Sequence, residues 1–390
     1  MPVVSRPSLL LPAVPDLTRW AVIACDQFTG VPAYWHELAS FIGDAPSTLN
    51  FVLPEAFLES EIDSAPARIS AAMEVALRDG TFREASGFVL VERTLASGAR
   101  RLGLIADIAL ADYEYTDISS ALIKATEQTV ADRLPPRVAV RAAAPLEAPH
   151  AIVLLDDPAF SVIERLYSQR DSFDLVYDFD LNMGGGHIRG WLIPDDDGAV
   201  LAGMLDLVDD GLFAVVGDGN HSIAAAKLAG DTKALVELVN IHDASIEFEP
   251  IHRVVFGAGA GFVVSFAAAM DGAAGSSAAK VRVVLDDDIV MVPVAANAAD
   301  AIADIQSFID SYLAANPGAS VDYIHGLNEA VAIAQSAEQA RIGAVVVEMP
   351  TIAKNGLFNY ARRRGVLPRK SFSIGHATDK RYYLEMAHRG

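Results

Sequence analysis

A short apolar strand that runs directly into a glycine-flanked aspartate constrains the fold of this chain more than any other feature. Residues 212–216 are apolar without a break, Gly217 and Gly219 then bracket Asp218, and residues 223–229 favour a helix. A wholly apolar strand is typical of a sheet that is covered on both faces, and a helix that begins a few residues later is typical of α/β proteins. We therefore expect an α/β fold.

The rest of the chain also alternates between strand and helix patterns. Antiparallel hairpins are expected at 88–110 and at 175–193, where apolar runs flank glycine-containing turns. The apolar run 49–53 favours a further strand, and apolar residues at helical spacing predict a helix that ends before Gly80. Hairpins together with strand–helix units predict mixed sheets.

The length of the chain allows two lobes. It has 390 residues, of which 52% are hydrophobic, which is enough for a large core. Residues 257–280 are rich in Gly, Ala and Ser, as connections often are, although their apolar centre also suits a helix. We expect a main α/β lobe at 1–256, a connection at 257–280, and a smaller C-terminal lobe at 281–390 whose tail returns to the functional site.

Charge and cysteine content exclude several classes of function. Thirty basic and 51 acidic residues give a net charge of −21, which repels a nucleic-acid backbone. No stretch approaches the roughly 20 apolar residues of a membrane span, and the N-terminus lacks a signal-peptide pattern. Cys25 is the only cysteine, which fits a reducing compartment. We expect a cytoplasmic protein that binds neither nucleic acid nor membrane.

The segment from Asp218 to Ser222 is the sharpest candidate for a functional site. The N–H groups of a first helical turn stabilise an anion, and Gly219 lets a phosphate approach the backbone. Asp218 is expected to hold a metal ion or a hydroxyl group, and Asn220, His221 and Ser222 to donate to phosphate oxygens. The alternative is a left-handed turn capped by Ser222, but histidine is a poor choice for capping, so a functional role is favoured.

Two acidic residues upstream are candidates for the same site. Asp26 follows the apolar run 20–24, at the strand end where α/β folds bind ligands; a local turn is the alternative. Glu127 lies in a segment whose hydroxyl groups and cations suit phosphate binding, and a solvated surface explains that segment equally well. Cys25 fits buried packing better than a nucleophilic role.

Residues towards the C-terminus add cations and a hydroxyl group. His252 and Arg253 alternate along an expected strand, so only one of them faces any given pocket. Lys370 and Ser371 lie in an extended basic stretch that suits the lining of a phosphate site. A solvated rim is the alternative for Lys370 and Ser371, and a structural role is the alternative for His252.

These landmarks resemble, over nearly the whole chain, a bacterial and archaeal family known as domain-of-unknown-function family 1015. Six short motifs of that family have counterparts here in the same order: Cys25-Asp26, Pro54-Glu55, Glu127–Thr129, Asp218–Ser222, Pro250–Arg253 and Leu367–Ser371. The family has arginine where this chain has Ser222, which removes a bidentate phosphate contact.

The motif Asp-Gly-x-His is also similar to the nucleotide-binding loop of the ParB/sulfiredoxin-like superfamily, which includes free-serine kinases. That resemblance implies nucleotide binding at residues 218–222. The loop contains no cysteine, so sulfiredoxin chemistry is not expected.

The first hypothesis is a small-molecule phosphotransferase that binds a phosphorylated ligand, ATP or ADP with Mg²⁺. Its catalytic residues would be Asp26, Glu127 and His221, and its metal ligand Asp218. Its phosphate-binding residues would be Asp218, Gly219, Asn220, Ser222, Arg253, Lys370 and Ser371.

Two other hypotheses remain open. A non-catalytic sensor of a nucleotide or phosphorylated metabolite would use the same loop. A metal-dependent hydrolase would use Asp218, His221 and His252, but no His-x-His or His-Glu-x-x-His spacing supports it.

Overall fold

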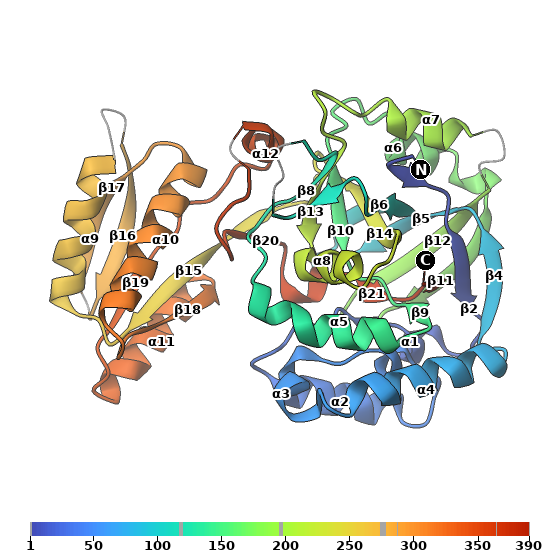
Figure 1. Cartoon of the computed structure of the whole chain (residues 1–390), viewed down its shortest axis with the longest axis horizontal. Helices are drawn as coiled ribbons and strands as arrows, with labels where there is room; N and C mark the ends of the chain where they lie inside the picture. The colour runs from blue at the N-terminus through green and yellow to red at the C-terminus, as the bar shows by residue number, and fades with distance from the viewer. Residues whose placement is uncertain are drawn as a thin grey trace. The chain divides into compact units, whose positions relative to one another are not determined.

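The protein folds into two compact units that each contain helices and strands (Figure 1). The first unit comprises Met1–Glu247, Ala361–Val366 and Ile374–Gly390, and the second comprises Phe248–Tyr360 and Leu367–Ser373. The computed structural model describes residues 2–116, 120–194, 198–273, 278–286, 288–363 and 365–389. The expected α/β class with mixed sheets is confirmed.

A ten-stranded sheet forms the centre of the first unit. Its strands follow the spatial order β11 (Asp174–Asp180), β12 (His187–Ile193), β5 (Phe88–Thr94), β6 (Arg100–Ala109), β14 (Lys233–Asn240), β10 (Ile152–Leu155), β13 (Ala214–Asp218), β8 (Ile123–Ala125) and β7 (Tyr113–Glu114), and β1 (Val4–Ser5) pairs with β6. The pairs β10–β14, β13–β8 and β7–β8 are parallel, and the other neighbours are antiparallel. Both expected hairpins, β5–β6 and β11–β12, are present.

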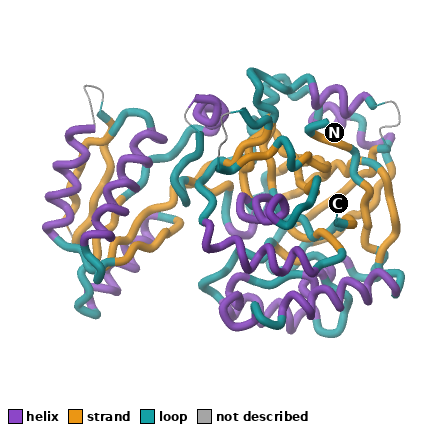
Figure 2. The backbone as a smooth tube through the Cα atoms, viewed as in Figure 1, coloured by secondary structure: helices purple, strands orange, loops and turns teal. Residues whose placement is uncertain are grey.

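The two faces of this sheet carry separate apolar cores. Val236 and Leu238 belong to one core and Leu235 to the other, because successive side chains of a strand point to opposite faces. One core takes residues from α6 (Ile163–Ser168), α7 (Ala199–Leu205) and α8 (Asn220–Leu228), and the other from α1 (Leu17–Trp20), α2 (Pro32–Ile42) and α4 (Ala65–Arg78). Helices thus lie on both sides of the strands (Figure 2).

Smaller elements of the first unit include its C-terminal segment. They are the pairs β2 (Ser8–Pro12) with β4 (Phe82–Ser86), β3 (Val22–Ile23) with β21 (Tyr382–Tyr383), and β9 (Leu146–Glu147) with β22 (Ala387–His388), and the helices α3 (Leu58–Glu61) and α5 (Leu134–Ala143). The last residues of the chain therefore pair with strands from its first half.

The second unit contains a sheet with the strand order β17-β16-β19-β15-β18. Its elements are α9 (Ala260–Ala273), α10 (Ala298–Ala315), α11 (Leu327–Gln339), β15 (Phe248–Phe256), β16 (Ala279–Leu285), β17 (Asp288–Val294), β18 (Ser320–His325) and β19 (Ala344–Val347). Two short elements, α12 (Leu357–Arg363) and β20 (Phe372–Ile374), have residues in both units.

The segment 257–280, expected as a connection, is largely helical. Helix α9 occupies Ala260–Ala273, and residues 274–277 lie outside the described residues. Phe262, Phe266 and Met270 are buried at helical spacing, so the segment contributes to a core. The units divide instead at Glu247, earlier than expected.

Candidate functional site

The loop 218–222 joins the end of β13 to the start of α8. Gly219 adopts a left-handed backbone with φ 84° and ψ 24° and precedes the first residue of the helix. A Cβ at this position would lie 2.8 Å from the Ala151 Cβ and 2.9 Å from its Cα. Glycine is therefore required for two reasons, its backbone conformation and its close approach to the neighbouring chain.

Two backbone amides at this junction have no acceptor within the described ranges of the chain. The Ser222 and Ile223 amides both donate to the Gly219 carbonyl, at 2.9 and 3.1 Å. The Gly219 and Asn220 amides have no hydrogen-bond partner among the described residues. These two donors lie at the positive end of α8, where an anion would be stabilised.

Asp218 lies beside a buried lysine and has one oxygen without a partner. Its Oδ1 is 3.7 Å from Lys380 Nζ, and the Lys380 side chain is only 5% exposed. Its Oδ2 is buried and has no hydrogen-bond partner in the part of the chain that the structure describes. Leaving such an oxygen unsatisfied costs about 1–3 kcal/mol or more, so the position suits a bound cation or a donor from a ligand.

The Asn220 side chain is bonded to the protein. Its Oδ1 accepts from the Thr126 amide at 3.3 Å, and its Nδ2 donates to Thr126 Oγ1 at 3.4 Å. Thr126 Oγ1 in turn donates to the Val216 carbonyl at 2.6 Å. These bonds fix the start of α8 to the end of β8, so the part of Asn220 that remains for an anion is its backbone amide.

His221 connects the loop to the segment that carries Glu127. Its Nε2 accepts a hydrogen bond from the Val130 amide at 3.1 Å. Thr126 and Val130, which lie on either side of Glu127, are therefore both bonded to the loop. Glu127 thus lies in a segment that is bonded to the loop on both sides of it.

A chain of contacts also links Asp26 to the loop. The Cys25 amide donates to the Tyr383 hydroxyl at 3.2 Å, and this hydroxyl lies 3.0 Å from His150 Nδ1. His150 directly precedes Ala151, the residue that packs against Gly219. Asp26 itself accepts from Gln27 Nε2 at 3.0 Å.

The thiol of Cys25 is not activated. Burial, reinforced by the neighbouring Asp26 carboxylate, raises the pKa of Cys25 to about 12. Since a nucleophilic cysteine needs its thiolate form, a protonated thiol at neutral pH supports a packing role.

Arg253 and His252 belong to the second unit and make internal bonds there. Arg253 is fully buried, donates to Gln306 Oε1 at 2.9 Å, and lies over the Tyr323 ring at 4.6 Å. His252 Nδ1 accepts from the Met349 amide at 3.1 Å. These bonds give both residues a structural role within the second unit.

Lys370 and Ser371 also lie in the second unit. Lys370 is exposed and adopts a left-handed backbone with φ 57°. Ser371 is buried, and its hydroxyl donates to the Pro368 carbonyl at 2.6 Å. Of the residues expected at the site, the first unit therefore contains Asp26, Glu127 and the loop residues, and the second contains Arg253, Lys370 and Ser371.

Buried charges follow Lys380, and no motif in the sequence had indicated them. Arg381 follows Lys380, and it donates to Glu237 Oε2 at 2.9 Å and to Glu385 Oε2 at 2.7 Å. Glu237 and Glu385 are themselves almost wholly buried. Two basic residues, Lys380 and Arg381, directly precede the apolar run 382–384. Because a buried charge needs a partner, this pattern could have indicated buried ion pairs.

The described residues limit which side chains could hold a metal ion. They contain no group of three or more His, Cys, Asp or Glu side chains that could hold a metal ion. A Mg²⁺ ion at Asp218 would thus take its other ligands from phosphate oxygens and water, which is usual for this ion.

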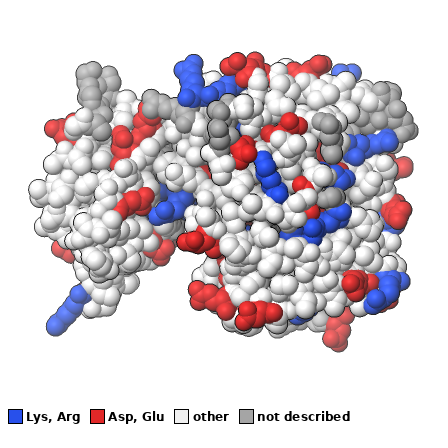
Figure 3. Space-filling model, viewed as in Figure 1, with Lys and Arg blue, Asp and Glu red and all other residues white. Residues whose placement is uncertain are grey.

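None of the helices in the described ranges is both long and apolar enough to cross a membrane. Acidic and basic side chains are interspersed on the face shown in Figure 3.

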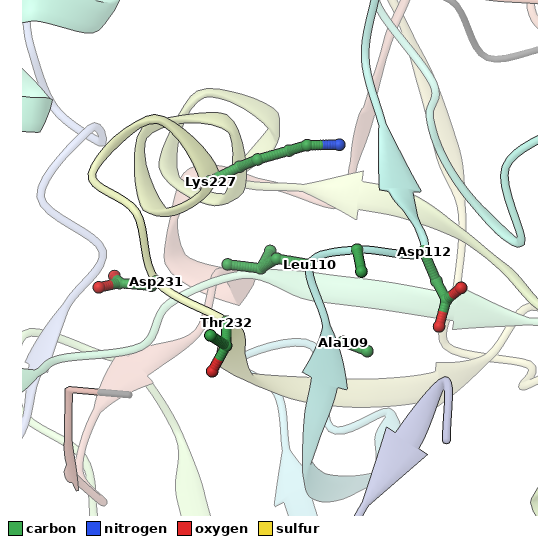
Figure 4. A pocket seen from close by; sticks show the side chains of 7 residues that line it. Ala109, Leu110, Asp112, Lys227, Asp231 and Thr232 are labelled. Carbon is green, nitrogen blue, oxygen red and sulfur yellow. The ribbon is translucent and has the colours of Figure 1, made fainter. Parts of the chain in front are cut away.

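A cavity of about 600 Å³ lies at the other end of α8 (Figure 4). Its lining includes Lys227 near the end of the helix, and Leu110 and Asp112 after β6. Lys227 Nζ is already bonded to Glu114 Oε2 at 3.0 Å. The cavity is therefore not part of the candidate site at residues 218–222.

Several solved structures are similar to this chain at low sequence identity. A conserved hypothetical protein from Pyrococcus furiosus is 13% identical, with 72% of this chain and 90% of that chain covered and a TM-score of 0.38. A free serine kinase in complex with AMP is 13% identical, with 72% and 87% covered and a TM-score of 0.38. SbnI from Staphylococcus aureus, with a C-terminal truncation, is 11% identical, with 70% and 83% covered and a TM-score of 0.39. These similarities are too distant to identify a ligand or an activity.

Sequence relationships identify the family. A search of the curated proteins finds no match. The model of the family described as "Protein of unknown function (DUF1015)" matches residues 11–312, which is more than half of the chain. The resemblance inferred from the ordered motifs is confirmed, and the chain belongs to this family.

Proposed function

We propose that the first unit binds the phosphate groups of a nucleotide at residues 218–222 and transfers a phosphoryl group to a small hydroxyl compound. One observation carries the proposal. A buried carboxylate oxygen of Asp218 without a partner directly precedes two backbone amides, of Gly219 and Asn220, that also lack partners among the described residues.

These groups suit a phosphate with its counterion. The two amides and the dipole of α8 favour negative charge, whereas the Asp218 carboxylate repels it. A cation between carboxylate and phosphate removes that conflict. Mg²⁺ would be held by Asp218 and, when bound, would neutralise charge on the phosphate oxygens. Lys380, 3.7 Å from the same carboxylate, adds a fixed positive charge.

The acceptor hydroxyl must lose a proton as it attacks phosphorus. In the transfer, the bond between the hydroxyl oxygen and phosphorus forms, the bond to the nucleotide oxygen breaks, and the proton passes to a carboxylate. Asp26 and Glu127 are the carboxylates of the first unit assigned to this role, because contacts through His150 and Val130 connect their segments to the loop. Which of the two acts is a question for separate Asp26→Asn and Glu127→Gln variants.

Thermal unfolding with Mg·ATP, Mg·ADP and Mg²⁺ alone tests the binding step. Ligand at 100 times Kd stabilises the native state by about 2.7 kcal/mol, which raises the melting temperature by several degrees. Asp218→Asn is expected to lose most of this rise. Asp171→Asn removes a side chain that is 91% exposed and is the matched control. Equal rises for wild type and Asp218→Asn would reject the site assignment.

The second step is tested by turnover. Conversion of ATP to ADP in the presence of small alcohols, with a new phosphate ester detected by mass spectrometry, is expected for wild type. The amount is expected to fall at least tenfold in Asp26→Asn or Glu127→Gln. Binding without turnover in wild type would instead support a non-catalytic sensor. Nothing in the described residues favours the metal-dependent hydrolase, whose proposed His252 lies in the second unit.

A further inference from the structure

A histidine–aspartate pair lies at the opposite end of β10 from Asp218. Strands β10 and β14 are parallel, and Leu155 pairs with Asn240 at their carboxyl ends. Asp156 follows β10, and His242 follows β14 by two residues. The His242 Nε2 atom is 2.8 Å from Asp156 Oδ1. Carboxyl ends of parallel strands are where α/β sheets bind ligands.

One face of this pair is available to a ligand. The His242 side chain is 26% exposed and the Asp156 side chain 29% exposed. When the neutral ring donates a hydrogen bond from Nε2–H to Asp156, Nδ1 carries the lone pair. Within the described ranges, Nδ1 has no hydrogen-bond partner. The contact with Asp156 thus fixes the ring and leaves Nδ1 as the acceptor of a partly exposed side chain.

The backbone that carries the ring is also fixed. The His242 amide donates to Asn240 Oδ1 at 3.2 Å. Asn240 Nδ2 donates to the Asp157 carbonyl at 2.9 Å and to Glu164 Oε1 at 3.0 Å. These bonds join the ends of both strands to the start of α6, so the position of the pair is set by the sheet and not by a loose loop.

Phe160 provides an independent sign of function beside this pair. Its backbone is left-handed, with φ 54°, although bulky residues adopt that conformation at a cost of about 1–3 kcal/mol. Its side chain is 44% exposed, and its ring centroid is 6.5 Å from that of His242, with an interplanar angle of 70°. An exposed aromatic ring held in a strained conformation is not explained by core packing.

The strained backbone of Phe160 persists because hydrogen bonds to Asp157 hold the turn that contains it. One of its carboxylate oxygens, Oδ2, accepts from the Ser161 amide at 2.6 Å and from the Val162 amide at 3.1 Å, and Oδ1 accepts from the Ser161 hydroxyl at 3.1 Å. The Phe160 amide donates to the Asp157 carbonyl at 3.1 Å. Four hydrogen bonds from three successive residues therefore hold Phe160 in place.

We propose that His242, Asp156 and Phe160 form a second binding site, which takes a planar aromatic ring bearing an N–H or O–H group. The ring packs against Phe160, and its N–H or O–H group donates to His242 Nδ1. The Arg362 guanidinium contacts two carboxylates, Asp156 at 3.6 Å and Asp209 at 2.9 Å. Negative charge therefore exceeds the charge of this cation beside the pair, so the ligand carries no negative charge there. The site lies roughly 13 Å along β10 from the residue that pairs with Asp218, so it does not depend on the proposed nucleotide site.

Two rings of matched shape test the proposal. Indole has an N–H group, and benzothiophene has the same fused shape without a donor. Ligand-observed NMR titration of the full chain is expected to show indole binding about five- to tenfold tighter than benzothiophene, which is the effect of one hydrogen bond. In His242→Ala the two affinities are expected to become equal.

The Phe160→Asn variant adds a readout that does not need a ligand. Asparagine tolerates the left-handed backbone, so the melting temperature is expected to rise by about 1–3 °C while both rings bind at least fivefold more weakly. Phe41→Asn replaces an aromatic of similar exposure, 41%, in α2 and should leave both affinities unchanged. Equal wild-type affinities for the two rings, no binding of either, or indole binding that survives Phe160→Asn would overturn the proposal.

Discussion

His221 Nε2 accepts a hydrogen bond from the Val130 amide at 3.1 Å. A ring nitrogen that accepts carries no proton, so this bond requires the neutral ring with its proton on Nδ1. His221 therefore ties α8 to the segment that contains Glu127. We therefore propose that His221 positions this segment, in addition to the catalytic role that the sequence indicated.

Replacement of His221 by alanine tests this role. The variant leaves the half-buried Val130 amide without its acceptor, so we expect a loss of about 1–3 kcal/mol in the free energy of unfolding and faster hydrogen exchange at Val130. Ser222→Ala is the control, because the Ser222 hydroxyl has no partner among the described residues; its effect should stay within about 0.5 kcal/mol. Unchanged exchange at Val130 in His221→Ala would refute the positioning role.

Gly219→Ala is expected to destabilise the protein more than a typical substitution in a turn. The left-handed backbone costs a non-glycine residue about 1–2 kcal/mol, and the new Cβ would meet Ala151 at 2.8 Å, which adds an overpacking cost of about 1–3 kcal/mol. Gly198 has a similar left-handed backbone, with φ 70° and ψ 15°, but no atom of the described residues lies within 4 Å of a Cβ built there. Urea unfolding should therefore show a clearly larger loss for Gly219→Ala than for Gly198→Ala. Equal losses would mean that the contact with Ala151 relaxes without cost.

The strand, loop and helix around Asp218 could be predicted because each depends on neighbouring residues. An uninterrupted apolar strand, a glycine with positive φ and an apolar helix face are all encoded within a few positions. The apolar run 49–53 was interpreted wrongly for a related local reason. The structure has a 3₁₀ helix at Thr48–Phe51, and the Ser47 hydroxyl accepts from the Leu49 amide at 3.3 Å, which competes with strand pairing.

The other half of the site could not be predicted, because it depends on contacts distant in sequence. Lys380 reaches Asp218 only after the C-terminal segment has paired with the first unit through β21 and β22. No spacing or composition pattern links residues that far apart. The same holds for Arg381 and Glu237, whose charges are compatible with burial only as a pair.

Glu237→Gln is expected to be among the most destabilising single substitutions in the first unit. Although burial alone would raise the pKa of Glu237, the nearby Arg101 and Arg381 lower it, so the carboxylate is ionised in the core. Removing its charge leaves buried guanidinium groups uncompensated, which costs about 3–5 kcal/mol. Glu348→Gln, which breaks an ion pair with Arg282 at the surface of the second unit, should cost no more than about 1 kcal/mol. Similar losses for the two variants in urea unfolding would contradict the buried-pair interpretation.

Glu114 should make the stability of the first unit depend on pH. Partial burial raises the pKa of Glu114, but hydrogen bonds outweigh this effect and hold the pKa at about 2. Its Oε1 accepts from the Tyr115 and Thr116 amides at 2.9 and 3.2 Å, and its Oε2 from Lys227 Nζ at 3.0 Å. In the unfolded chain, the pKa of a glutamate is about 4.3.

The direction of this pH dependence follows because the pKa of Glu114 is lower in the folded protein than in the unfolded chain. The ionised carboxylate contributes stability that is fully present above about pH 4.5 and is lost as the pH falls towards 2. Glu114→Gln should thus be less stable than wild type in urea at pH 7 and pH 5, and this difference should shrink at pH 3. Glu74→Gln, on the exposed side of α4, is the control and should stay within about 0.5 kcal/mol of wild type. A difference between Glu114→Gln and wild type that does not change between pH 7 and pH 3 would show that these hydrogen bonds do not depend on the charge of Glu114.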